Sequence, residues 1–207
     1  MSLANLYQKF LNVIRHADFL APLALRLYLA PVFWVSGMNK VYGFQGTVAW
    51  FGNPDRGLGL PLPTVMAYLA TATEVAGALL LLFGFGTRLI SIPLIFTMLV
   101  AIFKVHWVNG WQAIADPMSA FASGHLGPFQ FEDAAAAIDR LGKIRSLLKE
   151  HGNYSWLTGE GSVGILNNGI EFAATYLVML LALLYLGGGR FVSVDYWLGR
   201  RSAKTSG

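Results

Sequence analysis

Four stretches of predominantly apolar residues constrain the fold of this chain more than any other feature. They cover about residues 20–41, 64–83, 89–107 and 165–186. Each meets the requirement of roughly 20 mostly apolar residues for a helix that crosses a bilayer core of about 30 Å. A soluble amphipathic helix would carry a polar stripe, whereas residues 75–83 and 177–186 are apolar on every face. We therefore predict an all-α fold, an integral membrane four-helix bundle.

The composition excludes most other classes of protein. Hydrophobic residues make up 55% of the chain, charged residues only 13%, and the mean hydropathy is +0.53. A soluble domain usually carries about a quarter charged residues. The net charge of +4 does not predict nucleic-acid binding, because the cations cluster at the ends of apolar segments and form no basic stripe. The absence of cysteine excludes disulfides, thiolate metal sites and cysteine nucleophiles.

The distribution of Lys and Arg predicts the orientation in the membrane. Cytoplasmic loops are enriched in these residues, and placing both termini in the cytoplasm gathers most of them on that side. The short loop between the first two helices then holds Arg56 outside, with Lys40 at its membrane edge. An outer insert, about residues 108–164, is near the length at which charge counting stops steering topology. We expect residues 1–207 to form a single membrane domain. The cytoplasmic cations would be Lys9, Arg15, Arg88, Arg190, Arg200, Arg201 and Lys204.

Two further helices and one turn are predicted from local patterns. Residues 3–16 have an apolar stripe at helical spacing and should lie flat on the inner leaflet. A helix over about residues 132–150 has a similar stripe and should rest on the bundle or on the outer leaflet. Residues 84–88 (GFGTR) predict a tight turn, with a left-handed glycine and Thr87 as the cap of the next helix. The stripes are Leu3, Leu6, Tyr7, Phe10, Leu11 and Ile14, and Ala134, Ile138, Leu141, Ile144 and Leu148.

Ionisable residues inside the apolar segments are the candidate functional residues. Each costs roughly 2.5–3.5 kcal/mol at the centre of a membrane helix, so each calls for a partner or a task. Depth along the helices suggests that Arg26 reaches Glu74, and that Glu171 is reached by Lys40 or Lys104. The pairs either fix helix register or line a path for a proton, a quinone or an ion. The intramembrane candidates are Arg26, Lys40, Glu74, Lys104 and Glu171, and Arg88 and His106 are candidates at helix ends.

Three histidines of the insert are weak metal candidates. His106, His125 and His151 could bind copper or zinc. Their spacing matches no ligand motif, so we predict no metal site from the residues themselves. No nucleophile–base pair can be assembled either, and the catalytic residues stay unknown.

The chain resembles the DoxX family of small four-helix bacterial membrane proteins over essentially its whole length. The resemblance is carried by Arg26, by residues 33–40 (FWVSGMNK), by residues 74–88 (EVAGALLLLFGFGTR) and by residues 188–195 (GGRFVSVD). It implies a location in the bacterial cytoplasmic membrane. The family takes its name from a subunit of a thiosulfate:quinone oxidoreductase, so the resemblance also implies a quinone-linked role as one alternative.

The long insert is similar to that of one subgroup of the family. Residues 106–110 (HWVNG) and 168–171 (NGIE) carry this similarity, and the subgroup accompanies the biosynthesis of copper-binding, ribosomally made peptides. It implies an accessory role in maturation, export or redox handling of a metal-binding peptide, with a peptide or maturation protein as partner. The alternatives are a membrane subunit of a quinone-linked oxidoreductase and a small transporter or channel. A quinone and copper are both candidate cofactors. A homo-oligomer is also a candidate assembly.

Overall fold

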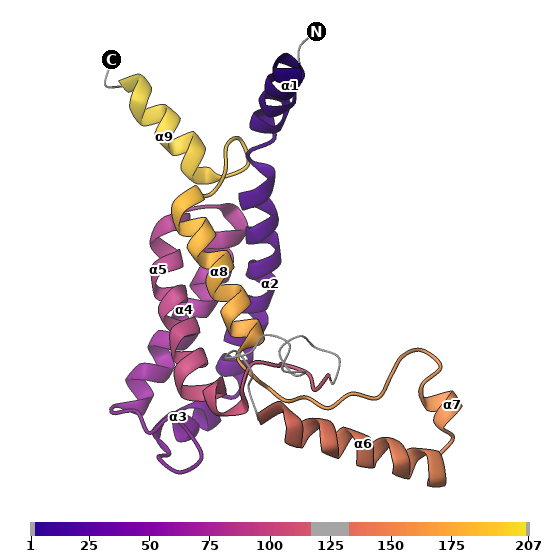
Figure 1. Ribbon diagram of the computed structural model, residues 1–207. Coiled ribbons are helices and arrows are strands. Elements are labelled where there is room, and N and C mark those ends of the chain that lie inside the picture. Colours follow the sequence, from indigo (N-terminus) through magenta and orange to yellow (C-terminus); the bar gives the residue numbers. More distant parts are fainter. Residues whose placement is uncertain (1–2, 117–132, 206–207) are drawn as a thin grey trace. The chain divides into compact units, whose positions relative to one another are not determined.

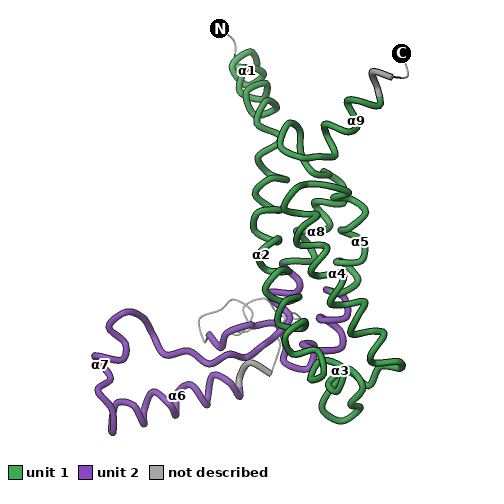
Figure 2. Tube along the Cα trace, turned by 180° about the vertical axis from the view of Figure 1, so that it is seen from behind, with its two compact units in different colours: residues 1–97, 176–207 green, residues 98–175 purple. Residues whose placement is uncertain are grey.

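The computed structural model describes residues 3–116 and 133–205, and every regular element in these ranges is a helix. A single antiparallel bridge joins Ile114 to Leu166. The prediction of an all-helical chain is therefore confirmed for the described residues. The chain divides into two compact units (Figure 2), which are residues 1–97 with 176–207 (unit 1) and residues 98–175 (unit 2).

Unit 1 contains helices from both ends of the chain, which are labelled in Figure 1. Helix α1 covers residues 3–16, as predicted, and none of its residues is buried. The short helix α3 follows α2 directly. The helices of unit 1 are α1 (Leu3–His16), α2 (Leu20–Tyr42), α3 (Phe44–Gly52), α4 (Pro63–Phe83), most of α5 (Thr87–Val100), most of α8 (Glu171–Leu186) and α9 (Val194–Thr205).

Small residues let the helices of unit 1 pack closely. A Cβ on Gly37 of α2 would lie 2.7 Å from the Val75 side chain of α4, and one on Gly77 of α4 would lie 2.9 Å from Leu94 of α5. Close approach at small residues is a general feature of helix packing in membranes. Helix α5 is also tied to α8, because Arg88 donates a hydrogen bond of 2.9 Å to a backbone carbonyl of α8. We call α2, α4 and the unit 1 parts of α5 and α8 the helical core.

Within residues 3–116 and 133–205, three helical stretches are long and apolar enough to cross a membrane. The first runs through α1 and α2 (Leu3–Tyr42), and the second is α4. The third is α5 with its continuation through a π-helical turn, η1 (Ala101–His106), and a 3₁₀ turn, η2 (Trp107–Asn109). These stretches contain the first three predicted spans, and the chain is a membrane protein.

The fourth predicted span differs at its start. We expected a helix from about residue 165, but α8 begins at Glu171 and has 16 residues, a length of about 24 Å. Residues 165–170 instead form backbone hydrogen bonds with residues 110–115, among them Ala115 N to Ile165 O at 2.9 Å and Asn167 N to Ala113 O at 2.9 Å. Their apolar side chains belong to an extended segment.

Unit 2 contains η1, η2, α6 (Asp133–His151) and α7 (Tyr154–Leu157). The predicted helix over about residues 132–150 is confirmed as α6. Its predicted apolar stripe is only partly buried: Leu141 is enclosed together with Ala137, whereas Ile144 is exposed. How α6 lies relative to a membrane stays a prediction.

Candidate functional site

An ion pair within the helical core joins α2 to α4. Lys40 Nζ lies 2.6 Å from Glu74 Oε2, and it also donates to the Ser36 hydroxyl at 2.9 Å. The Glu74 side chain is 6% exposed and that of Lys40 23%. Serine at this position, one turn before Lys40, supplies an acceptor that the ammonium group would otherwise lack. The carboxylate and the ammonium group therefore neutralise each other in an apolar setting.

The register between α2 and α4 explains this pair. Gly37 lies against Val75, and a Cβ on it would also lie 3.2 Å from Glu74 Cβ. Lys40 follows Gly37 by about one turn, so its side chain reaches back along α2 to Glu74. The expected pairing of Arg26 with Glu74 is wrong, because Arg26 lies about three turns before Gly37 and is level with the other end of α4.

Arg26 is fully buried at that end of the helical core. Its Nη2 donates a hydrogen bond of 2.9 Å to Val192 O. Gly84, in the left-handed conformation at φ +64°, leaves room for the guanidinium group, since a Cβ there would overlap Arg26 Nη1. Arg26 Nε and Nη1 are buried without a hydrogen-bond partner in the described residues. The Asp195 carboxylate supplies a counter-charge.

Asp195 also caps α5, a role that we predicted for Thr87. Its Oδ1 accepts from Gly86 N at 2.6 Å and its Oδ2 from Thr87 N at 2.9 Å, while Asp195 N donates to Gly84 O at 3.0 Å. A carboxylate suits this place because the first N–H groups of a helix lack partners inside it and carry partial positive charge. The Thr87 hydroxyl itself is buried and has no partner among the described residues.

The remaining candidates at helix ends have backbone partners. Arg88 donates to Tyr185 O, as described for the α5–α8 contact. His106 Nδ1 donates to Asn168 O at 2.9 Å within unit 2. Asn168 O also accepts from Asn109 Nδ2 at 3.1 Å. The structure thus brings together residues 106–110 and 168–171, the two segments that carry the subgroup resemblance.

Glu171 is the first residue of α8 and also binds these two chain segments together. We call the paired segments, residues 106–115 and 165–171, the junction of unit 2. Glu171 Oε2 accepts from Ala113 N at 2.9 Å, and Glu171 N donates to Trp111 O at 2.9 Å. The expected lysine partner is not observed: Lys40 is bound to Glu74, and Lys104 is exposed with no ion pair in the described part of the chain. Glu171 is therefore an organiser of backbone structure in unit 2.

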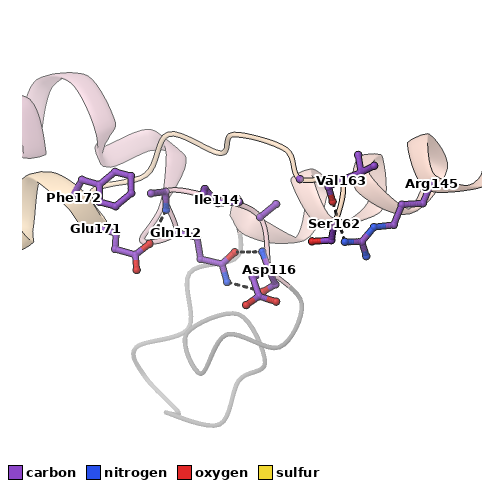
Figure 3. Close-up of a pocket in the computed structure, with 11 residues that line it drawn as sticks. Gln112, Ile114, Asp116, Arg145, Ser162, Val163, Glu171 and Phe172 are labelled. Carbon is purple, nitrogen blue, oxygen red and sulfur yellow. Dashed lines mark hydrogen bonds between the residues drawn. The ribbon is translucent and has the colours of Figure 1, made fainter. Parts of the chain in front are cut away.

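A pocket of about 480 Å³ lies beside this junction (Figure 3). On one side, the Gln112 side chain forms two hydrogen bonds with the backbone of Asp116. Gln112 Nε2 donates to Asp116 O at 3.0 Å, and Gln112 Oε1 accepts from Asp116 N at 3.1 Å. On the other side, Arg145 of α6 donates to Val163 O at 3.0 Å, and its Nε is buried without a partner within the described ranges. The labelled lining residues are Gln112, Ile114, Asp116, Arg145, Ser162, Val163, Glu171 and Phe172.

The histidines do not assemble into a metal centre in the described residues. No group of three or more His, Cys, Asp or Glu side chains that could hold a metal ion is found there. His106 is bound to Asn168, and His151 lies on α6, 3.7 Å from the adjacent Glu150. His125 lies outside the described residues.

The arrangement supports two kinds of chemistry. The Lys40–Glu74 pair is a buried acid–base couple that can exchange a proton if either partner changes its contacts. The pocket of unit 2 offers cationic and anionic side chains to a polar ligand. Sequence reasoning missed Asp195, Ser36 and Gln112 because their partners are set by tertiary contacts. Asp195 and Ser36 carried a signal, since they lie in the resembling segments 188–195 and 33–40, whereas Gln112 carried none.

Comparison with known proteins adds four findings. A family model described as DoxX matches residues 21–107. The chain is 35% identical to "Putative oxidoreductase CatD" of Bacillus subtilis (strain 168) over 83 residues, which cover 40% of this chain and 58% of that protein, less than two thirds of its length. It is 32% identical to "Inner membrane protein YphA" of Escherichia coli (strain K12) over 112 residues, 51% of this chain and 75% of that protein. No solved structure matches.

Proposed function

The chain belongs to the DoxX family of membrane proteins, and from this premise we propose that it is a membrane accessory protein. In this proposal it supports maturation, export or redox handling of a metal-binding peptide. The observation that carries the proposal is the junction in unit 2. There His106 and Asn109 bind Asn168, and Glu171 binds Ala113. The hydrogen bonds of the junction fix the structure around a polar pocket. Such a preformed pocket is what a binding site for a peptide requires.

The chemistry of the pocket favours a peptide with both polar and charged groups. Arg145 has an unused, buried Nε beside the pocket, and a buried donor of this kind gains from an added acceptor such as a carboxylate or a peptide carbonyl. Asp116 and Glu171 add anionic groups to the lining. A metal-binding peptide would be held through these groups, and the protein itself need not hold the metal.

Purification of the full chain from its own bacterial membranes in mild detergent tests this function. Intact-mass spectrometry would measure retained peptides, elemental analysis retained metal, and solvent extraction retained quinone. We expect a metal-binding peptide with the wild-type protein and much less of it with Arg145→Gln. The matched control is Arg140→Gln, on the same helix and exposed, which should retain the peptide. A wild-type sample free of peptide and metal would contradict the proposal.

A second candidate function is a membrane subunit of a quinone-linked oxidoreductase. The Lys40–Glu74 pair supports it, because quinone reduction by electrons from a partner subunit takes up protons, and the pair holds a proton on Lys40 that Glu74 can accept and pass on. The name of the Bacillus subtilis relative, "Putative oxidoreductase CatD", favours the same function. Quinone recovered with the wild-type protein, together with Glu74→Gln that folds but no longer supports quinone reduction in reassembled membranes, is the expected result. A quinone-free sample with no reductase activity would remove this candidate.

We also propose that four helices span the bacterial inner membrane, with both termini in the cytoplasm and the insert of about residues 108–164 outside. The cation distribution supports this topology. Since the chain lacks cysteine, a single introduced cysteine shows which side of the membrane its position faces, with no background labelling of native cysteines. We expect Lys143→Cys on α6 to react with a membrane-impermeant maleimide in spheroplasts, and Lys9→Cys on α1 to react only after lysis. The reverse pattern would invert the topology.

A further inference from the structure

A second pocket, of about 420 Å³, lies in unit 1 where α5 begins and α8 ends. The run of three glycines at residues 187–189 forms one wall. Arg88 and Leu89 of α5 and Arg190 and Tyr196 on the other side line the rest. None of these residues takes part in the function proposed above, so the pocket calls for a separate account.

The glycine wall presents hydrogen-bond donors that nothing in the described chain accepts. Gly187 N donates to Leu183 O at 2.8 Å, but the following N–H groups of Gly188, Gly189 and Arg190 have no partner among the described residues. Gly188 is buried, and buried N–H groups are almost always paired in native structures. A ligand that supplies oxygen acceptors would satisfy them.

A buried side chain with an unused hydrogen-bond donor lies behind this wall and does not itself line the pocket. The Thr87 hydroxyl is fully buried and has no partner within the described ranges. A Cβ on Gly188 would lie 2.8 Å from Thr87 Oγ1, so the hydroxyl faces the wall where the side chain of residue 188 is absent. A side chain at position 188 would also lie 2.7 Å from Ser193 Cβ, so glycine is required for the close packing of this wall against Thr87 and Ser193.

The charges at the pocket favour an anion. Arg88 uses one guanidinium donor for Tyr185 O, and Arg190 uses one for Asp18 at 3.1 Å, so both keep donors free for a further acceptor. The Asp195 carboxylate also lines the pocket. Its two oxygens are occupied by the N–H groups of Gly86 and Thr87, which reduces its repulsion of an incoming anion.

The neighbouring surface is apolar and suits a lipid. Leu89 and Leu186, which both line the pocket, are 74% and 54% exposed, and a membrane protein presents such side chains to acyl chains. Aromatic residues are enriched at the level of the headgroups, and Tyr196 lines the pocket. We propose that this pocket binds the phosphate group of an anionic phospholipid, with the acyl chains along α5 and α8.

The test uses the full chain in nanodiscs that contain equal amounts of phosphatidylglycerol and phosphatidylcholine. Native mass spectrometry then gives the ratio of the two lipids that stay bound to the released protein. We expect the wild-type protein to retain the anionic lipid in clear excess. Arg88→Gln should reduce this excess about fivefold, because one arginine near anionic lipid contributes about 1 kcal/mol and 1.4 kcal/mol corresponds to tenfold. The double variant with Arg190→Gln should lower it further.

Two controls keep the result specific. Arg15→Gln on α1 removes the same charge from an exposed position of unit 1 and should leave the excess unchanged. Added inorganic phosphate separates a lipid site from a site for free phosphate: millimolar phosphate should not displace the lipid. A wild-type protein without preference for the anionic lipid overturns the proposal, as does an equal loss in Arg15→Gln or ready displacement by free phosphate. The wild-type arm decides even if a variant fails to fold.

Discussion

Lys40 Nζ lies 2.6 Å from Glu74 Oε2, one helical turn beyond the close contact of Gly37 with Val75. The ion pair and the helix contact therefore depend on the same register between α2 and α4. A shift of one turn along either helix would separate the charges by about 5 Å and leave both without a partner in an apolar setting. This mutual dependence makes the pair and the glycine contact separately testable.

Glu74→Gln should destabilise the protein by about 3 kcal/mol, because it leaves the Lys40 ammonium group without its counter-charge. Thermal unfolding in detergent measures the loss. The double variant Lys40→Met with Glu74→Gln should regain much of the stability, since no unpaired charge remains. If the double variant is as unstable as the single one, the pair does not act as a neutral unit.

Gly37→Ala should destabilise the helical core by about 1–2 kcal/mol. The added Cβ would lie 2.7 Å from Val75 Cγ2 and 3.0 Å from Val75 N, and overpacking of this kind forces helices apart. Gly46→Ala in α3 is the matched control, because nothing lies within 4 Å of its Cβ. There the better helix propensity of alanine should raise stability by up to about 1 kcal/mol. Equal unfolding temperatures for the two variants would contradict the contact.

Arg26→Ala should loosen the segment between α8 and α9. It removes the donor to Val192 O and leaves a cavity at the end of α4, at a cost of about 2–4 kcal/mol. We expect faster tryptic cleavage after Arg190, whose side chain is 53% exposed in this segment. Arg15→Ala, on the exposed surface of α1, should leave the cleavage rate unchanged. Wild-type rates in Arg26→Ala would show that other contacts hold the segment.

Gly169→Ala should disorganise the junction of unit 2. A Cβ at this position would overlap Gln112 O and lie 2.7 Å from Gly110 O, so the paired backbones must separate. Hydrogen exchange should accelerate at the amides of Ala115 and Asn167. Gly164→Ala is the control, since its Cβ would lie 3.6 Å from Ile114 Cγ2, an ordinary contact. Unchanged protection in Gly169→Ala would refute the close approach.

The sequence predicts the helices well where one physical requirement dominates. Length and hydropathy are enough for α2, α4 and α5, because a helix in lipid must be long and apolar. They fail at the start of α8. Residues 165–170 include the apolar Ile165, Leu166 and Ile170, but the backbone of this segment is paired with residues 110–115. Hydropathy carries no information about that pairing.

The candidate site was predicted in part. The sequence identifies Arg26, Lys40 and Glu74 as costly charges, and all three are in the helical core. It does not predict which charges pair, because depth was counted separately along each helix, whereas the contact of Gly37 with Val75 sets the register. The cap of α5 was missed for a related reason. Thr87 is a good local candidate, but Asp195 is a stronger acceptor supplied by the fold.

The cap at Asp195 has a consequence for biosynthesis. The acceptor for the N–H group of Thr87 lies 108 positions later in the chain, so it is synthesised much later than Thr87 itself. While the ribosome is still making α6 and α8, the turn between α4 and α5 stays incomplete, and Val192 has not yet reached Arg26. The three long apolar helical stretches can form early, but the contacts at this end of the protein are complete only after residue 195 has been translated.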